Sequence, residues 1–190
     1  LMTSVIDNPS KVSEYIYACR QMNIKILPPD INKGEANFSV DGGDIRYGLA
    51  AIKSIGRPVI KAIVEDREEL GVFQNLEDFI TRLSAKNILN KRTIENLIKA
   101  GALDTLGGTR KQFMSIYVQI VDHVTQEKKN SMVGQMTLFD GSFGDYSNIT
   151  TIPIPDLPEY DKRFLLDKEL EYSGFYITSH PLDEFPEILN

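Results

Sequence analysis

The chain has 190 residues, of which 42% are hydrophobic and 25% charged, and its formal net charge is −6. This composition is typical of a globular protein, and no window holds the roughly 18 consecutive apolar residues of a membrane-spanning helix. The single Cys19 excludes an internal disulfide, and two well-separated histidines exclude a zinc-type ligand cluster. We therefore expect a soluble, cytoplasmic protein that makes no membrane contact.

The first fifty residues predict a helix followed by a β-hairpin. Asn8 is a suitable N-cap and Pro9 fits the first helical position, and apolar residues then recur at helical spacing. Pro28 and Pro29 end this unit, because proline interrupts a helix and favours extended geometry in the residue before it. Apolar residues then alternate on both sides of residues 41–43, Asp-Gly-Gly, which predicts a hairpin turn there.

Residues 50–129 read as helices with short breaks. The first break lies at residues 54–56, and the helix after it is opened by Pro58 and ended by Gly71. Asn75 and Asn90 are plausible caps of two further helices, and a longer amphipathic helix follows. The sequence therefore predicts a mainly α fold with a small β-hairpin, an α+β protein.

The character of the sequence changes after Asn130. Polar and glycine residues are followed by three prolines within "TIPIPDLPEY", so residues 130–160 predict a linker or an irregular wrap. A final amphipathic helix begins near Asp161, and the chain then reaches "SHPLDEF".

Catalytic patterns are weak. Asp41 and Asp44 lie close together, but turn chemistry explains two carboxylates in a tight hairpin. No phosphate-binding P-loop or nucleophile elbow is present, and no convincing acidic cluster indicates a two-metal site. The charge distribution is more informative, since residues 50–112 hold 11 Lys and Arg against 8 Asp and Glu in an acidic chain. This local basic excess permits nucleic-acid contact, although a charge run is often only a solvated surface.

Two helix–turn–helix stretches predict phosphate binding. A helix start offers unpaired N–H groups and the positive end of the helix dipole, and a glycine in the turn allows close approach. Two such units in tandem would follow a duplex backbone without reading its sequence, whereas the alternative is a pair of ordinary αα-turns. The predicted DNA-binding residues are Lys53, Ser54, Gly56, Arg57 and Lys61 in the first unit, and Gly107, Gly108, Arg110 and Lys111 in the second.

The stretch "GQMTLFDG" places Leu138 and Phe139 side by side without a hydrophobic period around them. They could anchor a loop on the chain's own domain. Alternatively, they could enter a preformed pocket on another protein, where binding would cost the ordering of a few residues.

Several segments closely resemble bacterial C-family replicative polymerases, the DNA polymerase III alpha subunits of DnaE type. These are "SVIDNPSKVSEYIYACRQMNIKILPPDINKG", "IRYGLAAIKSIG", "NLEDFITRL", "NKRTIENLIKAGALDTLGGTRKQF" and "SGFYITSHPLDEF", in this order. The resemblance covers essentially the whole chain. It implies the end of a fingers domain at 1–49, tandem helix-hairpin-helix DNA binding at 50–129, a linker with a clamp-binding peptide at 130–160, and a helix leading toward an absent OB-fold domain at 161–190.

The same resemblance implies partners and a role. The family's clamp ligands have the form Gln-x-x-Leu-Phe, which Gln135, Met136, Thr137, Leu138 and Phe139 fit. The expected partners are double-stranded DNA, the bacterial sliding clamp and other replicase subunits. The parent would be a DNA-directed DNA polymerase with Mg²⁺ in its palm.

On this resemblance the chain itself lacks the palm and its catalytic aspartates, so we expect a processivity segment that is inactive alone and holds no cofactor. The alternatives are a free-standing adaptor that tethers another enzyme to the clamp, or a purely structural helical module. We expect a piece of a larger protein, because the chain starts within a helix-and-hairpin unit and stops just after "SHPLDEF".

Overall fold

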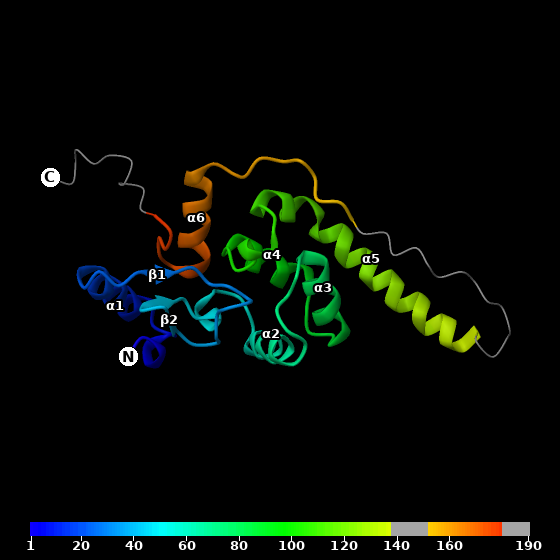
Figure 1. The fold of residues 1–190 in the computed structure, drawn as a ribbon, viewed down its shortest axis with the longest axis horizontal. Helices are drawn as coiled ribbons and strands as arrows, with labels where there is room; N and C mark the ends of the chain where they lie inside the picture. Colours follow the sequence, from blue (N-terminus) through cyan, green and yellow to red (C-terminus); the bar gives the residue numbers. More distant parts are fainter. Residues whose placement is uncertain (138–151, 180–190) are drawn as a thin grey trace.

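The computed structural model describes residues 1–137 and 152–179, and for residues 132–137 it describes the helical backbone alone. Helices dominate, and one small sheet lies at the N-terminal end (Figure 1). The predicted fold class is therefore confirmed. No helix in the described ranges has the length and apolar character needed to cross a membrane.

The N-terminal unit is built as the sequence predicts. After the short 3₁₀ turn η1 (Thr3–Val5), the Asn8 side chain accepts a hydrogen bond from the Lys11 amide and caps α1 (Pro9–Gln21). The strands β2 (Ser39–Asp41) and β3 (Asp44–Arg46) form the antiparallel hairpin. A third strand, β1 (Ile26–Leu27), lies parallel to β3, so the strand order is β1-β3-β2.

The helical body follows the 3₁₀ turn η2 (Leu49–Ala51). It consists of α2 (Arg57–Leu70), α3 (Leu76–Ala85) and α4 (Lys91–Lys99), then the 3₁₀ turn η3 (Asp104–Leu106) and α5 (Arg110–Thr137). The Asn75 and Asn90 side chains accept hydrogen bonds from the amides of Asp78 and Thr93, so both predicted caps are confirmed. Fully buried Phe79, Leu97 and Phe113 belong to the core around which these helices pack.

Buried charge joins α2 to α3. Asp66 is almost completely buried, and its carboxylate accepts from Arg82 at 2.7 Å and pairs with Lys86 at 2.9 Å. The Arg82 guanidinium also donates to the carbonyls of Asp66 and Gly71 and lies over the Phe73 ring. This network fixes the orientation of α2, the helix that follows the predicted phosphate-binding turn at residues 54–56.

Helix α5 is longer than the sequence predicts. We expected irregular structure from Asn130, but the helix continues to Thr137. Between these residues there is no proline to stop the ladder of backbone hydrogen bonds, and the single Gly134 weakens a helix without ending it. Residues 152–160 are irregular, as expected, and they lie along the body as a strap rather than as a free linker.

The last described helix, α6 (Lys162–Ser173), returns to the N-terminal unit (Figure 1). Asp161 caps its start, and the buried Tyr47 hydroxyl donates to the Ser173 carbonyl at 2.6 Å. Burial raises the pKa of Tyr47, so this hydroxyl stays protonated and remains a donor. The buried Glu169 carboxylate accepts from the amides of Ile177 and Thr178, which holds the segment after the helix.

Candidate nucleic-acid interface

The first hairpin is a turn between η2 and α2 whose apolar residues face inward. Ile52 and Ile55 are buried, while Lys53, Ser54 and Gly56 between and beside them are exposed. Ser54 adopts the left-handed region, with φ 63°, which lets the chain reverse between two core anchors. Two hydrogen bonds hold this turn from outside. The Lys53 amide donates to the Tyr172 carbonyl at 2.8 Å, and the Asn96 amide group donates to the Ser54 carbonyl at 3.4 Å.

The start of α2 has no side-chain cap. Gly56 occupies the cap position, and the amides of Val59 and Ile60 both donate to its carbonyl. Pro58 has no N–H, so the unpaired donors are the amides of Gly56 and Arg57, which have no hydrogen-bond partner among the described residues. Two adjacent amides at the positive end of a 14-residue helix are suited to an anion.

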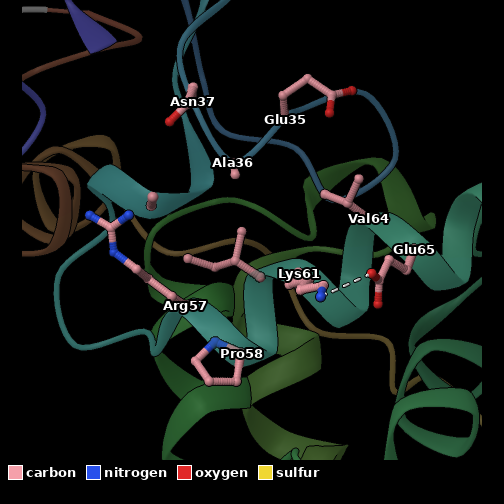
Figure 2. Close-up of a pocket in the computed structure, with 10 residues that line it drawn as sticks. Glu35, Ala36, Asn37, Arg57, Pro58, Lys61, Val64 and Glu65 are labelled. Atoms are coloured by element: carbon pink, nitrogen blue, oxygen red, sulfur yellow. Dashed lines mark ion pairs between the residues drawn. The ribbon is translucent and has the colours of Figure 1, made fainter. Parts of the chain in front are cut away.

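Cations flank these amides. The side chains of Arg57 and Lys61 are 76% and 74% exposed, and each meets one carboxylate, Asp7 or Glu65, at 3.5 Å. Exposed pairs of this length contribute little free energy, so both cations can exchange their partner for a phosphate. Arg57 and Lys61 also border a cavity of about 540 Å³, in which Lys61 pairs with Glu65 (Figure 2). All five predicted residues of the first hairpin are thus exposed, with Ser54 and Gly56 lining one cavity and Arg57 and Lys61 lining another.

The second hairpin is different, because the predicted DNA contact Arg110 is buried rather than exposed. Its residue surface is 5% exposed, and its guanidinium makes a fork of hydrogen bonds to the Asp104 carboxylate at 2.8 to 3.2 Å. Buried Glu169 lies 3.7 Å away on the other side. Burial raises the pKa of Asp104, and the hydrogen bond from Arg110 opposes that shift. Arg110 therefore joins η3, α5 and α6 inside the protein.

The start of α5 already holds an anion. The Glu159 carboxylate accepts from the amide of Arg110 at 2.8 Å and from the amide of Lys111 at 3.1 Å. The Lys111 ammonium lies 5.6 Å from the centre of the Tyr160 ring, and the Gln112 side chain donates to the Pro155 carbonyl. Residues 155–160 of the strap thus cover the place where a phosphate was expected.

The two glycines of this hairpin have structural reasons to be glycine. Gly107 ends η3 in the left-handed region, with φ 83°, which a residue without a Cβ adopts easily. A Cβ on Gly108 would collide with the Phe113 ring. Gly107 is exposed, so DNA contact at this residue stays a proposal. At Gly108, packing against Phe113 already explains why the residue is glycine.

Replacing Glu159 tests its role as the cap of α5. We expect Glu159→Ala to lower the free energy of unfolding by about 1–2 kcal/mol, because two helix amides lose their acceptor. Urea denaturation followed by circular dichroism measures this difference. Asp156→Ala is the matched control, since Asp156 is an exposed carboxylate of the same strap. Equal stability of the two variants would contradict the capping role.

The sequence interpretation missed two exposed cations, Lys91 and Arg92, which are the first residues of α4. They lie beside the first hairpin, because Ser54 and Arg92 line the same two cavities. The available signal was "NKR", a cap followed directly by two cations, but only the fold shows that α4 starts next to residue 54.

The clamp-peptide residues are only partly placed. Gln135 and Met136 belong to the last turn of α5, where the structure describes only the backbone. Leu138 and Phe139 lie outside the described residues. The far end of α5 extends beyond the helical body (Figure 1).

Among the described residues, no three His, Cys, Asp or Glu side chains form a group that could hold a metal ion.

Comparison with known proteins gives a consistent result. Residues 23–113 match a helix-hairpin-helix motif family. The chain is 36% identical over 189 residues to a DNA polymerase III subunit alpha of Mycobacterium leprae, and 39% identical over 186 residues to that of Vibrio cholerae. That of Borreliella burgdorferi is 33% identical over 189 residues. These alignments cover 97 to 100% of this chain but only 16% of each relative. Over nearly its whole length the chain is therefore similar to one segment of DNA polymerase III alpha subunits, and residues 23–113 of it match a helix-hairpin-helix motif family.

Proposed function

We propose that this chain binds the backbone of duplex DNA, without sequence preference, through the first helix-hairpin-helix unit. The observation that carries the proposal is the exposed turn at residues 53–57, where two unpaired amides lie between cations at the start of α2. The comparisons support it, because a helix-hairpin-helix motif suggests DNA binding and the relatives are subunits of a DNA polymerase. Lys53, Ser54, Gly56, Arg57 and Lys61 are the proposed contacts, and Gly107 and Lys111 are secondary ones.

Salt dependence tests this proposal. Phosphate contacts release counterions, so the affinity for a duplex should fall steeply as salt rises and should not depend on base sequence. Fluorescence anisotropy with labelled duplexes of two unrelated sequences measures both properties. Arg57→Ala is expected to weaken binding about fivefold at about 0.15 M salt and to reduce the log–log slope by about one. An affinity that does not change with salt would contradict backbone binding.

Gly56→Ala tests the close approach of the backbone. Gly56 has φ −71° and ψ 140°, which alanine adopts freely, and an added Cβ would meet only the Pro58 ring, at 3.6 Å. The fold should therefore remain intact, while the methyl group would occupy the space next to the amides. A drop in DNA affinity with unchanged stability supports phosphate contact at this turn.

We further propose that residues 135–139 bind a sliding clamp. Their sequence fits Gln-x-x-Leu-Phe, and α5 carries the beginning of this peptide to the far end of the molecule (Figure 1). A chain that holds both duplex and clamp would keep a polymerase attached between catalytic events. On this proposal the segment works within a DNA-directed DNA polymerase, alongside other replicase subunits, and supplies processivity rather than chemistry.

A further inference from the structure

The start of α4 forms the opposite side of a groove that begins at the first hairpin. The Asn90 side chain caps this helix through the Thr93 amide, so the next residues of the chain, Lys91 and Arg92, take the first two helical positions and are exposed. The hydrogen bond from Asn96 to the Ser54 carbonyl fastens α4 to the hairpin turn. Cations from two separate elements therefore lie at fixed positions relative to the same turn.

Two cavities adjoin between these elements. Both are lined by Ser54 and Arg92, so together they form one groove, which we call the α4 groove. The larger, of about 600 Å³, is lined by Lys53, Ser54, Lys91, Arg92, Glu95, Asn96, Glu171 and Tyr172. The smaller, of about 520 Å³, is lined by Ser54, Gly56, Pro58, Val59, Ile88, Asn90, Arg92 and Thr93.

The charges of the α4 groove favour an anionic ligand. Its two carboxylates already have cationic partners, since Glu95 pairs with Lys99 and Glu171 pairs with Lys168. A hydrogen bond from Lys99 lowers the pKa of Glu95, and this side chain therefore stays in its pair as a carboxylate.

The cations of the groove are less fully paired. The Lys91 ammonium forms an ion pair with the carboxylate of Asp122 in α5, at 2.6 Å. Lys53 and Arg92 have no carboxylate within ion-pair distance among the residues that the structure describes. The smaller cavity contains Arg92 and no acidic residue at all. An incoming phosphate at the end of the groove next to Gly56 would therefore meet Arg92, which has no ion-pair partner among the described residues.

We propose that the α4 groove is a second phosphate-binding position for the same nucleic-acid backbone, with Arg92 as its principal cation and Lys53 as the residue shared with the first hairpin. This inference rests on the proposed DNA binding by the first hairpin and extends it. The next main contact of the strand would then be the start of α4, because Glu159 already occupies the amides at the start of α5.

The test measures duplex affinity of the 190-residue chain as a function of salt for Arg92→Ala. Loss of one phosphate contact is expected to weaken binding about fivefold at about 0.15 M salt and to lower the slope by about one. Arg92→Lys keeps the charge and should retain most of the slope. Because Arg92 is exposed, neither variant should change the unfolding midpoint. If the two phosphates are separate, Arg57→Ala with Arg92→Ala should weaken binding about 25-fold, the product of the single effects.

Arg163→Ala is the matched control, since it removes one exposed arginine from α6, away from the groove. An equal loss for Arg163→Ala and Arg92→Ala would overturn the α4 groove, because net charge alone would explain both. The same conclusion follows if Arg57→Ala weakens binding and Arg92→Ala does not, and in that case the first hairpin remains the DNA contact. Binding that does not change with salt would overturn the proposed function itself.

Discussion

Arg110→Ala is expected to lower the free energy of unfolding by about 3 kcal/mol. The guanidinium is buried and satisfies Asp104 through several hydrogen bonds, with the nearly inaccessible Glu169 beside it. Removing one partner of a buried ion pair costs about 3–5 kcal/mol, because the other charge stays behind without compensation. The lower end applies here, since the Asp104 side chain is 44% exposed and water can reach part of it.

Urea denaturation of Arg110→Ala, followed by circular dichroism, measures this effect. Arg163→Ala should change stability by no more than about 0.5 kcal/mol, as expected for a surface residue without a buried partner. Arg110→Lys keeps the charge but cannot reproduce the forked geometry, so an intermediate loss is expected. If Arg110→Ala were as stable as the control while DNA affinity fell, Arg110 would be a DNA contact after all.

Leu138→Ala combined with Phe139→Ala is expected to weaken binding to the cognate sliding clamp by about 100-fold or more. Apolar side chains that fill a pocket are typical hot spots, and two of them together carry about 3 kcal/mol or more of binding free energy. Isothermal titration calorimetry of the clamp with the 190-residue chain measures the loss. The unfolding midpoint should stay unchanged, because the two side chains are expected to serve a partner's pocket.

The control for this double variant is Ile154→Ala, which removes another exposed apolar side chain, 45% exposed, from the same connection between α5 and α6. It should leave clamp affinity unchanged. Undiminished binding by the double variant would place the clamp-binding residues elsewhere in the chain. A lowered unfolding midpoint together with reduced binding would instead favour the loop-anchor interpretation.

Local signals account for most of what the sequence predicted correctly. Asn8, Asn75 and Asn90 cap helices through amides three residues away, so each start is encoded within one turn. The glycine turn at residues 42–43 likewise defines the β-hairpin on its own. The first hairpin could be read for the same reason, because the apolar pair at positions 52 and 55 forces the residues beside it outward.

The errors come from contacts that the chain makes over long distances. Nothing near Arg110 in the sequence reveals that Glu159, 49 residues later, accepts from its amide. Burial of the Arg110 side chain likewise depends on α6 packing behind it. Arg92 was missed because only the packing of α4 against residue 54 brings this exposed cation next to the first hairpin. Local patterns locate helix starts, whereas tertiary packing decides which of them remain open to an external anion.

The contact between the first hairpin and α6 has a mechanical consequence. The Lys53 amide is bound to the Tyr172 carbonyl, and the Tyr47 hydroxyl to the carbonyl of Ser173. The turn that we expect to grip DNA is therefore braced directly by the last described helix. Tension applied beyond residue 179 would therefore have a short path to the hairpin turn, through α6 and the bond to Lys53, in addition to the path through the helical body that α6 also contacts. On the proposed function, the orientation of the bound duplex is thereby coupled to the direction in which the chain leaves α6.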